Sequence, residues 1–313
     1  MNVIFMGTPE FAVPCLEQLI ADGHTVPLVV TQDDKPKGRG QKLTPPPVKA
    51  AALEHNIPVL QPVSLKDSET QATLASYAPD LIVLVAYGKI LPKAVLELPR
   101  FGCINVHASL LPRYRGAAPI QWAVLNGETV SGVTTMFMNE GLVDTGDMLL
   151  KAECPIDNDM TAGDLHDRLS ELGAALLSQT LVKLEEGTLE RIPQTDDDTC
   201  YAPMLTKDLR EIDFTMPASQ VHNRVRGLNP WPSATVWFEG KRLKLQRTAV
   251  GEACDAEPGT VVSTRPVAIA CGERTSLVLV QVQYEGGKSL SAEDFFRGHP
   301  LTVGQRFGYV TLP

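Results

Sequence analysis

Several features that would place this chain in a specialised class are missing from it. No apolar run approaches the roughly 20 residues that a membrane-spanning helix requires. The N-terminus, MNVIFMGTPEF, lacks the basic and long apolar segments of a secretory signal peptide. Hydrophobic residues make up 43% of the chain and charged residues 21%, as in ordinary globular proteins. We therefore expect a cytoplasmic protein with no membrane partner.

The six cysteines offer neither a disulfide framework nor a metal site. They lie far apart, without a C-x-x-C pair or a Cys/His cluster of the spacing that zinc sites use. Isolated cysteines of this kind are usually small, buried apolar residues. The sequence therefore predicts no metal ion and no thiol nucleophile.

A basic surplus, typical of proteins that bind nucleic acid, is absent from the chain as a whole, whose net charge is −9. Residues 1–205 hold 15 Lys and Arg against 26 Asp and Glu, a net charge of −11, whereas residues 206–313 hold 13 against 11, a net charge of +2. Two local clusters are basic: Lys35, Lys37, Arg39 and Lys42 in one, and Arg224, Arg226, Lys241, Arg242, Lys244 and Arg247 in the other. A polyanion could bind at these two patches.

The first 150 residues alternate short β-branched runs with helical stretches. Residues 3–6, 25–31, 81–86, 103–108 and 132–138 are predicted strands, and a helix of some 25 residues is predicted to end at Gly187. This pattern is typical of a Rossmann-like α/β domain, an open parallel sheet with helices on both faces. The first turn, Gly7-Thr8-Pro9, does not follow G-x-G-x-x-G, so the dinucleotide fingerprint is absent.

The composition changes after the long predicted helix. Residues 190–205 are polar, acidic and interrupted by proline, as in a linker. Residues 206–313 contain short apolar runs separated by glycine turns, which predicts a small C-terminal β-barrel of the OB-like type. We therefore expect a catalytic domain at residues 1–189 and a second domain at residues 206–313.

Three polar side chains are candidates for catalysis. Asn105 and His107 are two residues apart on a predicted strand, so their side chains leave the same face roughly 7 Å apart. Asp144 begins the turn Asp144-Thr145-Gly146-Asp147, from which its carboxylate can reach the histidine. By itself, His107 could equally be a structural residue, and the aspartate could belong to a solvated turn.

Longer motifs around these residues resemble those of folate-dependent formyltransferases. NVHASLLPRYRGAAPIQWA and GLVDTGD carry the resemblance, which implies that Asn105, His107 and Asp144 are catalytic. It also implies that 10-formyltetrahydrofolate is the formyl donor, bound by the loop after residues 81–86 and by the S-L-L-P stretch: Tyr87, Gly88, Ile90, Leu91, Pro92, Ser109, Leu110, Leu111 and Pro112. The leucines could instead be ordinary core residues. One departure is that two residues, Leu142 and Val143, stand between the glycine and Asp144, where the family has one.

The motifs FMGTPEFA, GRGQKLTPPPVKA and NPWPSA resemble those members of the family that formylate initiator methionyl-tRNA. In these enzymes a basic loop enters the acceptor stem, which implies the same role for residues 32–49, with Arg39 foremost. The C-terminal domain, with its own basic cluster, would then bind tRNA. An aminosugar nucleotide remains the alternative acceptor, and a formyltetrahydrofolate hydrolase or an inactive tRNA-binding protein is less favoured. We expect a monomer.

Overall fold

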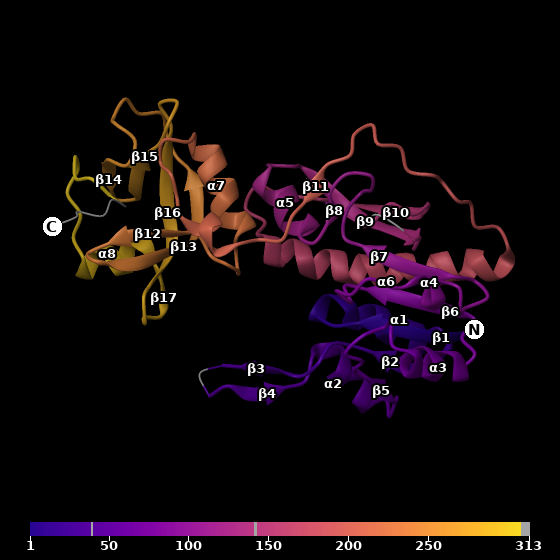
Figure 1. Ribbon diagram of the computed structural model, residues 1–313. Coiled ribbons are helices and arrows are strands. Elements are labelled where there is room, and N and C mark those ends of the chain that lie inside the picture. Colours follow the sequence, from indigo (N-terminus) through magenta and orange to yellow (C-terminus); the bar gives the residue numbers. More distant parts are fainter. Residues whose placement is uncertain (39, 141–142, 308–313) are drawn as a thin grey trace. The chain divides into compact units, whose positions relative to one another are not determined.

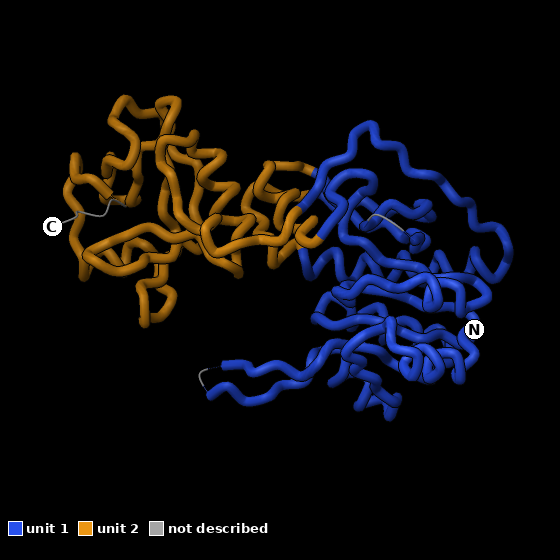
Figure 2. The backbone as a smooth tube through the Cα atoms, viewed as in Figure 1, with its two compact units in different colours: residues 1–116, 130–155, 166–202 blue, residues 117–129, 156–165, 203–313 orange. Residues whose placement is uncertain are grey.

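The computed structural model describes residues 1–38, 40–140 and 143–307 (Figure 1). They form two compact units (Figure 2). Unit 1 comprises residues 1–116, 130–155 and 166–202, and unit 2 comprises residues 117–129, 156–165 and the chain from residue 203 onward. The predicted linker, residues 190–205, thus overlaps unit 1 as far as Ala202. The domain limits at residues 189 and 206 stay a prediction.

A seven-stranded sheet forms the centre of unit 1, in the order β10-β9-β7-β6-β1-β2-β5 (Figure 1). Its strands are β1 (Asn2–Gly7), β2 (Thr25–Val30), β5 (Val59–Leu60), β6 (Leu81–Val85), β7 (Cys103–His107), β9 (Val130–Phe137) and β10 (Met148–Pro155). β5, β2, β1, β6 and β7 are parallel, which confirms the Rossmann-like prediction. β9 and β10 add an antiparallel hairpin at one edge.

Helices cover both faces of this sheet. They are α1 (Val13–Ala21), α2 (Pro47–Glu54), α3 (Ser68–Ser76), α4 (Lys93–Leu96) and α6 (Ala162–Glu186), with a 3₁₀ turn η1 at Glu10–Ala12. Cys103 of β7 packs in a core with Leu74 of α3 and Val95 of α4. On the opposite face, Gly173 of α6 lies so close to β7 that an added Cβ would be 3.1 Å from Val106 Cγ1.

The alternation of side chains along β7 decides where the candidate residues lie. Successive residues of a strand point to opposite faces, so Asn105 and His107 share the face of Cys103, which α3 and α4 cover, and not the face that α6 covers. His107 is the last residue of β7, at the carboxyl end where open α/β sheets bind their ligands.

Residues 35–37 and 42–44, which belong to the predicted basic loop, form the two strands of a hairpin. β3 (Lys35–Lys37) pairs antiparallel with β4 (Lys42–Thr44), with Lys37 opposite Lys42. Its sequence lacks the apolar alternation by which a half-buried strand is predicted, because no face of the hairpin is buried. The predicted contact residue Arg39 lies outside the described residues.

Unit 2 is built on a curled antiparallel half-barrel, in agreement with the predicted small β-domain (Figure 1). Its strands are β12 (Thr235–Phe238), β13 (Lys241–Val250), β14 (Val261–Thr264), β15 (Val267–Ala270), β16 (Ser276–Tyr284) and β17 (Ser289–Ser291). Three helices, α5 (Pro119–Leu125), α7 (Ala218–Gly227) and α8 (Ala292–Gly298), and a 3₁₀ turn η2 (Lys207–Arg210) complete it. Val221 and Val225 of α7 and Phe295 of α8 join its core.

Helix α7 was not expected in a domain predicted from strands. Its apolar residues are few, but Val225 lies four residues after Val221 and three after His222, so the three share one face and are buried together.

No helix in the described part of the chain is long and apolar enough to cross a membrane.

Candidate active site

His107 is held by the loop that follows it. Its Nε2 lies 2.9 Å from the carbonyl oxygen of Tyr114, and the residue is 6% exposed. Because a carbonyl only accepts hydrogen bonds, Nε2 must carry the proton and donate it. The other ring nitrogen, Nδ1, faces Asp144 Oδ2 at 3.6 Å. Nδ1 is therefore the nitrogen that carries no proton in the neutral ring, and it faces the Asp144 carboxylate.

Asp144 is buried and fixed through its carboxylate. Its Oδ2 accepts a hydrogen bond from the Gly116 amide at 3.0 Å, and the residue is 9% exposed. Its backbone lies in the left-handed region, with φ of 56°, which aspartate tolerates better than most residues do. The structure thus brings the predicted pair His107 and Asp144 together. Of the two residues that precede the aspartate, Leu142 lies outside the described residues, and Val143 is 52% exposed.

Asn105 lies two residues before His107 on β7, where its neighbours are Leu84 of β6 and Met136 of β9. Its side chain is half-buried. Within the described residues the side-chain amide has no hydrogen-bond partner from the protein. This amide therefore has donors that the described protein does not use.

The S-L-L-P stretch is tied to the sheet through polar side chains. The hydroxyl of Thr134, which is fully buried on β9, donates to the carbonyl of Ser109 at 2.7 Å and accepts from the amide of Leu111 at 3.1 Å. The ammonium group of Lys151 on β10 donates to the carbonyl of Leu111, and burial lowers its pKa. The hydroxyl of Ser109 donates to the carbonyl of Arg113.

The apolar residues predicted to contact folate divide into buried and accessible ones. Leu111 is 0% exposed and packs on Met136, and Leu91 is 5% exposed within the core beside α4. Both side chains belong to the core, the alternative left open by the sequence. Ile90 is 79% exposed and Leu110 is half-buried, so these two can still form an apolar wall.

The loop between β6 and α4 is shaped around Tyr87. Its carbonyl accepts hydrogen bonds from the Thr8 hydroxyl at 3.2 Å and the Gln32 amide at 2.8 Å. Gly88 has φ of 80°, and an added Cβ would lie 2.5 Å from Gln32 Nε2, so a glycine is required here. Pro92 then precedes the first residue of α4.

Four residues that the sequence did not single out support the site: Thr134, Arg115, Gly116 and Gln194. Gln194 belongs to the segment predicted as a linker, yet its side chain binds carbonyls of the Asp144 turn. Their contacts join distant parts of the chain, as in the bond between Arg115 Nη1 and Asp196 Oδ1, which lie 81 positions apart. No local motif reports such pairings.

The basic residues predicted to bind tRNA differ in accessibility. Lys35, Lys37 and Lys42 are exposed on the β3–β4 hairpin. Arg226, by contrast, is 6% exposed, and its guanidinium donates to the carbonyls of Asp157 and Met160 at 3.1 and 3.2 Å. Arg226 is therefore a structural residue of the interior of unit 2 and does not present its charge to a ligand.

Four of the remaining basic residues lie on β13: Lys241, Arg242, Lys244 and Arg247. Lys244 and Arg247 are exposed and lie opposite Gln283 and Gln281 of β16, while Leu243 and Leu245, on either side of Lys244, point into the core. The outward-facing Arg242 lies over the ring of Trp237, 5.0 Å from its centroid. Lys241 lies over the ring of Tyr284 at the end of this strand.

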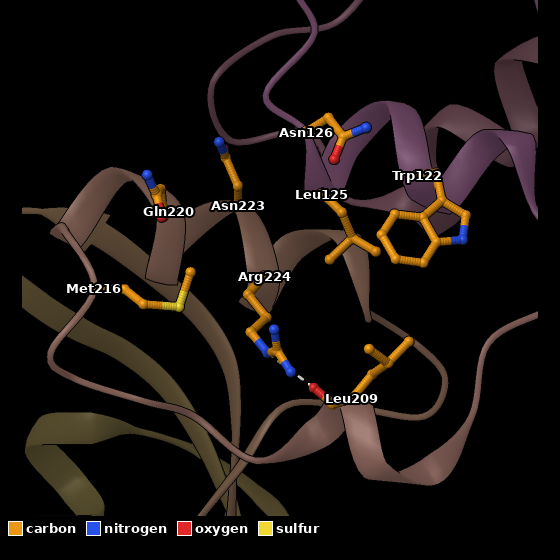
Figure 3. Close-up of a pocket in the computed structure, with 8 residues that line it drawn as sticks. All are labelled: Trp122, Leu125, Asn126, Leu209, Met216, Gln220, Asn223 and Arg224. Carbon is orange, nitrogen blue, oxygen red and sulfur yellow. Dashed lines mark hydrogen bonds between the residues drawn. The ribbon is translucent and has the colours of Figure 1, made fainter. Parts of the chain in front are cut away.

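Arg224 lines a pocket of about 470 Å³ within unit 2 (Figure 3). The pocket lies between α5, α7 and the segment from η2 to Met216, and Trp122, Leu125, Asn126, Leu209, Met216, Gln220, Asn223 and Arg224 line it. The guanidinium of Arg224 turns inward and donates to the Leu209 carbonyl at 2.8 Å, as the dashed line in Figure 3 shows. Burial lowers the pKa of this group.

Among the described residues no three His, Cys, Asp or Glu side chains are placed to hold a metal ion. Burial raises the pKa of Cys15, Cys103 and Cys271 to about 12, so these thiols stay protonated near neutral pH.

Comparisons with known proteins agree with this architecture. A family model described as "Formyl transferase" matches residues 1–181, and one described as "Formyl transferase, C-terminal domain" matches residues 204–300. The chain resembles a solved N-formyltransferase from Helicobacter canadensis in complex with folinic acid and dTDP-3-aminofucose, with a TM-score of 0.68, 19% identity and coverage of 91% of this chain and 99% of that chain. HypX from Aquifex aeolicus, in complex with tetrahydrofolic acid, has a TM-score of 0.64 at 18% identity over 95% of this chain and 47% of that chain. At such identities these two structures show a common fold alone.

Curated relatives are far more similar in sequence. The methionyl-tRNA formyltransferase of Acetivibrio thermocellus is 49% identical over 312 residues, covering 98% of this chain and 100% of the relative. That of Geobacter sulfurreducens is 52% identical over 311 residues, covering 98% of this chain and 97% of the relative. The matched regions cover nearly the whole of both units. The chain therefore belongs to the methionyl-tRNA formyltransferase family.

Proposed function

We propose that this chain transfers the formyl group of 10-formyltetrahydrofolate to the α-amino group of initiator methionyl-tRNA in the cytoplasm. The observation that carries the proposal is the identity of about half of all residues with methionyl-tRNA formyltransferases over the whole length. The geometry around His107 supports the chemistry, and the exposed cations of the hairpin and of β13 support the choice of a polyanionic acceptor.

The reaction exchanges one carbon–nitrogen bond for another. The neutral α-amine attacks the formyl carbon, which forms the new C–N bond and places negative charge on the formyl oxygen. The C–N10 bond then breaks, the oxygen becomes a carbonyl again, and the amine proton passes to N10. The enzyme must stabilise the oxyanion and move that proton, and no covalent intermediate with the protein is needed.

Each catalytic candidate has a role that its contacts allow. The Asn105 amide, which makes no competing bond to the described protein, donates to the oxyanion. Nδ1 of His107 takes the proton from the attacking nitrogen and returns it to N10, while Nε2 stays bound to the Tyr114 carbonyl. Asp144, 3.6 Å away, stabilises the imidazolium that forms between these two transfers.

The pterin of the donor would bind at the carboxyl ends of β6 and β7. Backbone groups of Tyr87–Pro92 would contact its polar edge, with Ile90 and Leu110 as the apolar wall, while residues 141–142 of the predicted contact loop lie outside the described residues. The S-L-L-P stretch, held by Thr134 and Lys151, would form the opposite side.

Transfer of labelled formyl from 10-formyltetrahydrofolate tests both the chemistry and the acceptor. Charged initiator methionyl-tRNA, elongator methionyl-tRNA and an aminosugar nucleotide are offered in parallel, and released formate is measured. Label on the initiator alone is the expected result. Label on the sugar would keep the chemistry and replace the acceptor, formate alone would indicate a hydrolase, and tRNA binding without any turnover of the folate would indicate an inactive protein.

A further inference from the structure

A strap of residues 192–202 crosses the catalytic end of unit 1. At its start, the backbone of Ile192 exchanges two hydrogen bonds with Met148 of β10, at 2.8 and 2.9 Å. At its end, β11 (Tyr201–Ala202) pairs in parallel with β8 (Arg115–Gly116). The strap is thus fixed to unit 1 at both ends.

Gln194 lies between these attachments and binds the turn that carries Asp144. Its side-chain amide donates to the carbonyl of Asp144 at 2.9 Å and to the carbonyl of Gly146 at 2.7 Å. Asp144 has φ of 56°, a left-handed backbone conformation that is unfavourable for a non-glycine residue. Such a turn is stable only where neighbouring contacts stabilise it, and the two hydrogen bonds from Gln194 are contacts of this kind.

The orientation of the Gln194 side chain is itself determined. Arg115 is 9% exposed, and its Nε donates to Gln194 Oε1 at 2.9 Å. Because guanidinium only donates, the oxygen of the glutamine faces Arg115 and the amide nitrogen faces the turn. Asp196 of the strap binds Nη1 of the same arginine at 3.1 Å. Arg115 is therefore the support of the Gln194 amide.

The strap also places the group that binds the carboxylate of Asp144. The amide of Gly116 donates to that carboxylate, and Gly116 pairs with Ala202 of β11. Gly116 has φ of 114°, and an added Cβ would lie 2.7 Å from a ring carbon of Tyr201 and 2.8 Å from the Ala202 carbonyl oxygen. The strap therefore binds the backbone of Asp144 directly, through Gln194, and its carboxylate indirectly, through Gly116.

We propose that Gln194 is a positioning residue for Asp144, with Arg115 as its support. Gln194 does not act on the reacting atoms directly. It acts by keeping the Asp144 carboxylate beside Nδ1 of His107. The inference rests on the proposed function, in which Asp144 stabilises the His107 imidazolium. A displacement of a catalytic group by about 1 Å can lower a rate by a factor of about 100, so the loss of this hold should be measurable.

The test compares Gln194→Ala and Gln194→Glu with a neighbouring control. Gln194→Glu keeps the length of the side chain but replaces the amide donor with an acceptor that faces two carbonyls. Thr195→Ala alters an exposed side chain of the same strap. We expect kcat for formyl transfer to fall by about tenfold or more in both Gln194 variants, and to stay within about twofold of the wild type in the control. A Gln194→Glu enzyme with wild-type kcat would overturn the proposal, since a mere packing role tolerates that change.

A double-mutant cycle separates action through Asp144 from a general structural defect. In an Asp144→Asn background, Gln194→Ala should cost less than about twofold, because the group that it positions is already impaired. An equal loss in both backgrounds would refute the proposal.

Amide hydrogen exchange at residues 144–147 gives a readout that needs no substrate. Exchange there should be faster in Gln194→Ala and unchanged in Thr195→Ala. Unchanged exchange in Gln194→Ala overturns the positioning role. A wild-type enzyme that transfers no formyl would refute the proposed function instead, and the exchange result would still decide whether Gln194 holds the turn.

Discussion

Thr134→Val is a nearly isosteric change that affects the free energy of unfolding in two opposite ways: it buries an additional methyl group, and it removes a hydroxyl that makes two hydrogen bonds. Valine replaces a hydroxyl with a methyl group at a fully buried position, so the hydrophobic effect alone predicts a more stable protein by roughly 1 kcal/mol. The hydroxyl, however, is the partner of both the Leu111 amide and the Ser109 carbonyl. Valine leaves these two peptide groups unpaired, at a cost of about 1–3 kcal/mol each.

The balance of these terms is a loss of about 3 kcal/mol in the free energy of unfolding, within a range of about 1–5 kcal/mol. Thr134→Ser is the matched control, because it keeps the hydroxyl and removes one buried methyl group, at a cost of about 1 kcal/mol. The serine variant should therefore be more stable than the valine variant in urea unfolding, although serine is the less hydrophobic residue. The Leu111 amide should exchange faster in the valine variant, and the KM for 10-formyltetrahydrofolate should rise with it. A valine variant as stable as the serine variant would refute the reasoning.

Three further changes test other parts of the molecule. Tyr87→Phe removes a buried hydroxyl that has no partner among the described residues, so the free energy of unfolding at pH 7 should rise by about 1 kcal/mol. Burial raises the pKa of Tyr87 from 10.0 to about 12, so its hydroxyl loses the proton in the unfolded state first, and the free energy of unfolding of the wild type falls between pH 10 and 12. Urea unfolding at several pH values should show that Tyr87→Phe lacks this part of the decline. An identical decline in the variant would contradict the assignment. Asn105→Ala should lower kcat about a hundredfold with little change in the KM for tRNA, and a loss of only a few-fold would exclude an oxyanion role. The double variant Lys37→Ala/Lys42→Ala should raise the KM for tRNA severalfold and weaken its salt dependence, whereas Lys66→Ala, an exposed control outside both basic clusters, should leave both unchanged.

The candidate site could be predicted only as far as its residues stand in continuous motifs. Asn105 and His107 share a strand whose alternation is local, and Asp144 stands in a turn whose residues are contiguous. Gln194 could not be found in this way, because its segment is polar and acidic and has the composition of a linker. Its side chain forms hydrogen bonds to backbone carbonyl groups. Because every residue has such a group, the sequence of side chains does not indicate which residues are the partners.

Charge clusters show the same limit for the tRNA surface. In the sequence, Arg224 and Arg226 cannot be told apart from Lys244 and Arg247. In the structure, Arg226 is enclosed by carbonyls of residues 157 and 160, whereas Lys244 and Arg247 extend from the outer face of β13. Charge is a property of the residue, but accessibility depends on which other segment lies over it.

The sequence by itself determined the family, the order of the parallel strands along the chain and the identity of the catalytic candidates, since these depend on local periodicity and contiguous motifs. Only the tertiary structure decided that Nε2 of His107 donates to the Tyr114 carbonyl while Nδ1 faces Asp144, and that Gln194, 50 residues further along the chain, binds the Asp144 turn. The physical reason is that hydrogen-bond direction and burial are set by pairs of groups distant in sequence, whose proximity exists only in the folded chain.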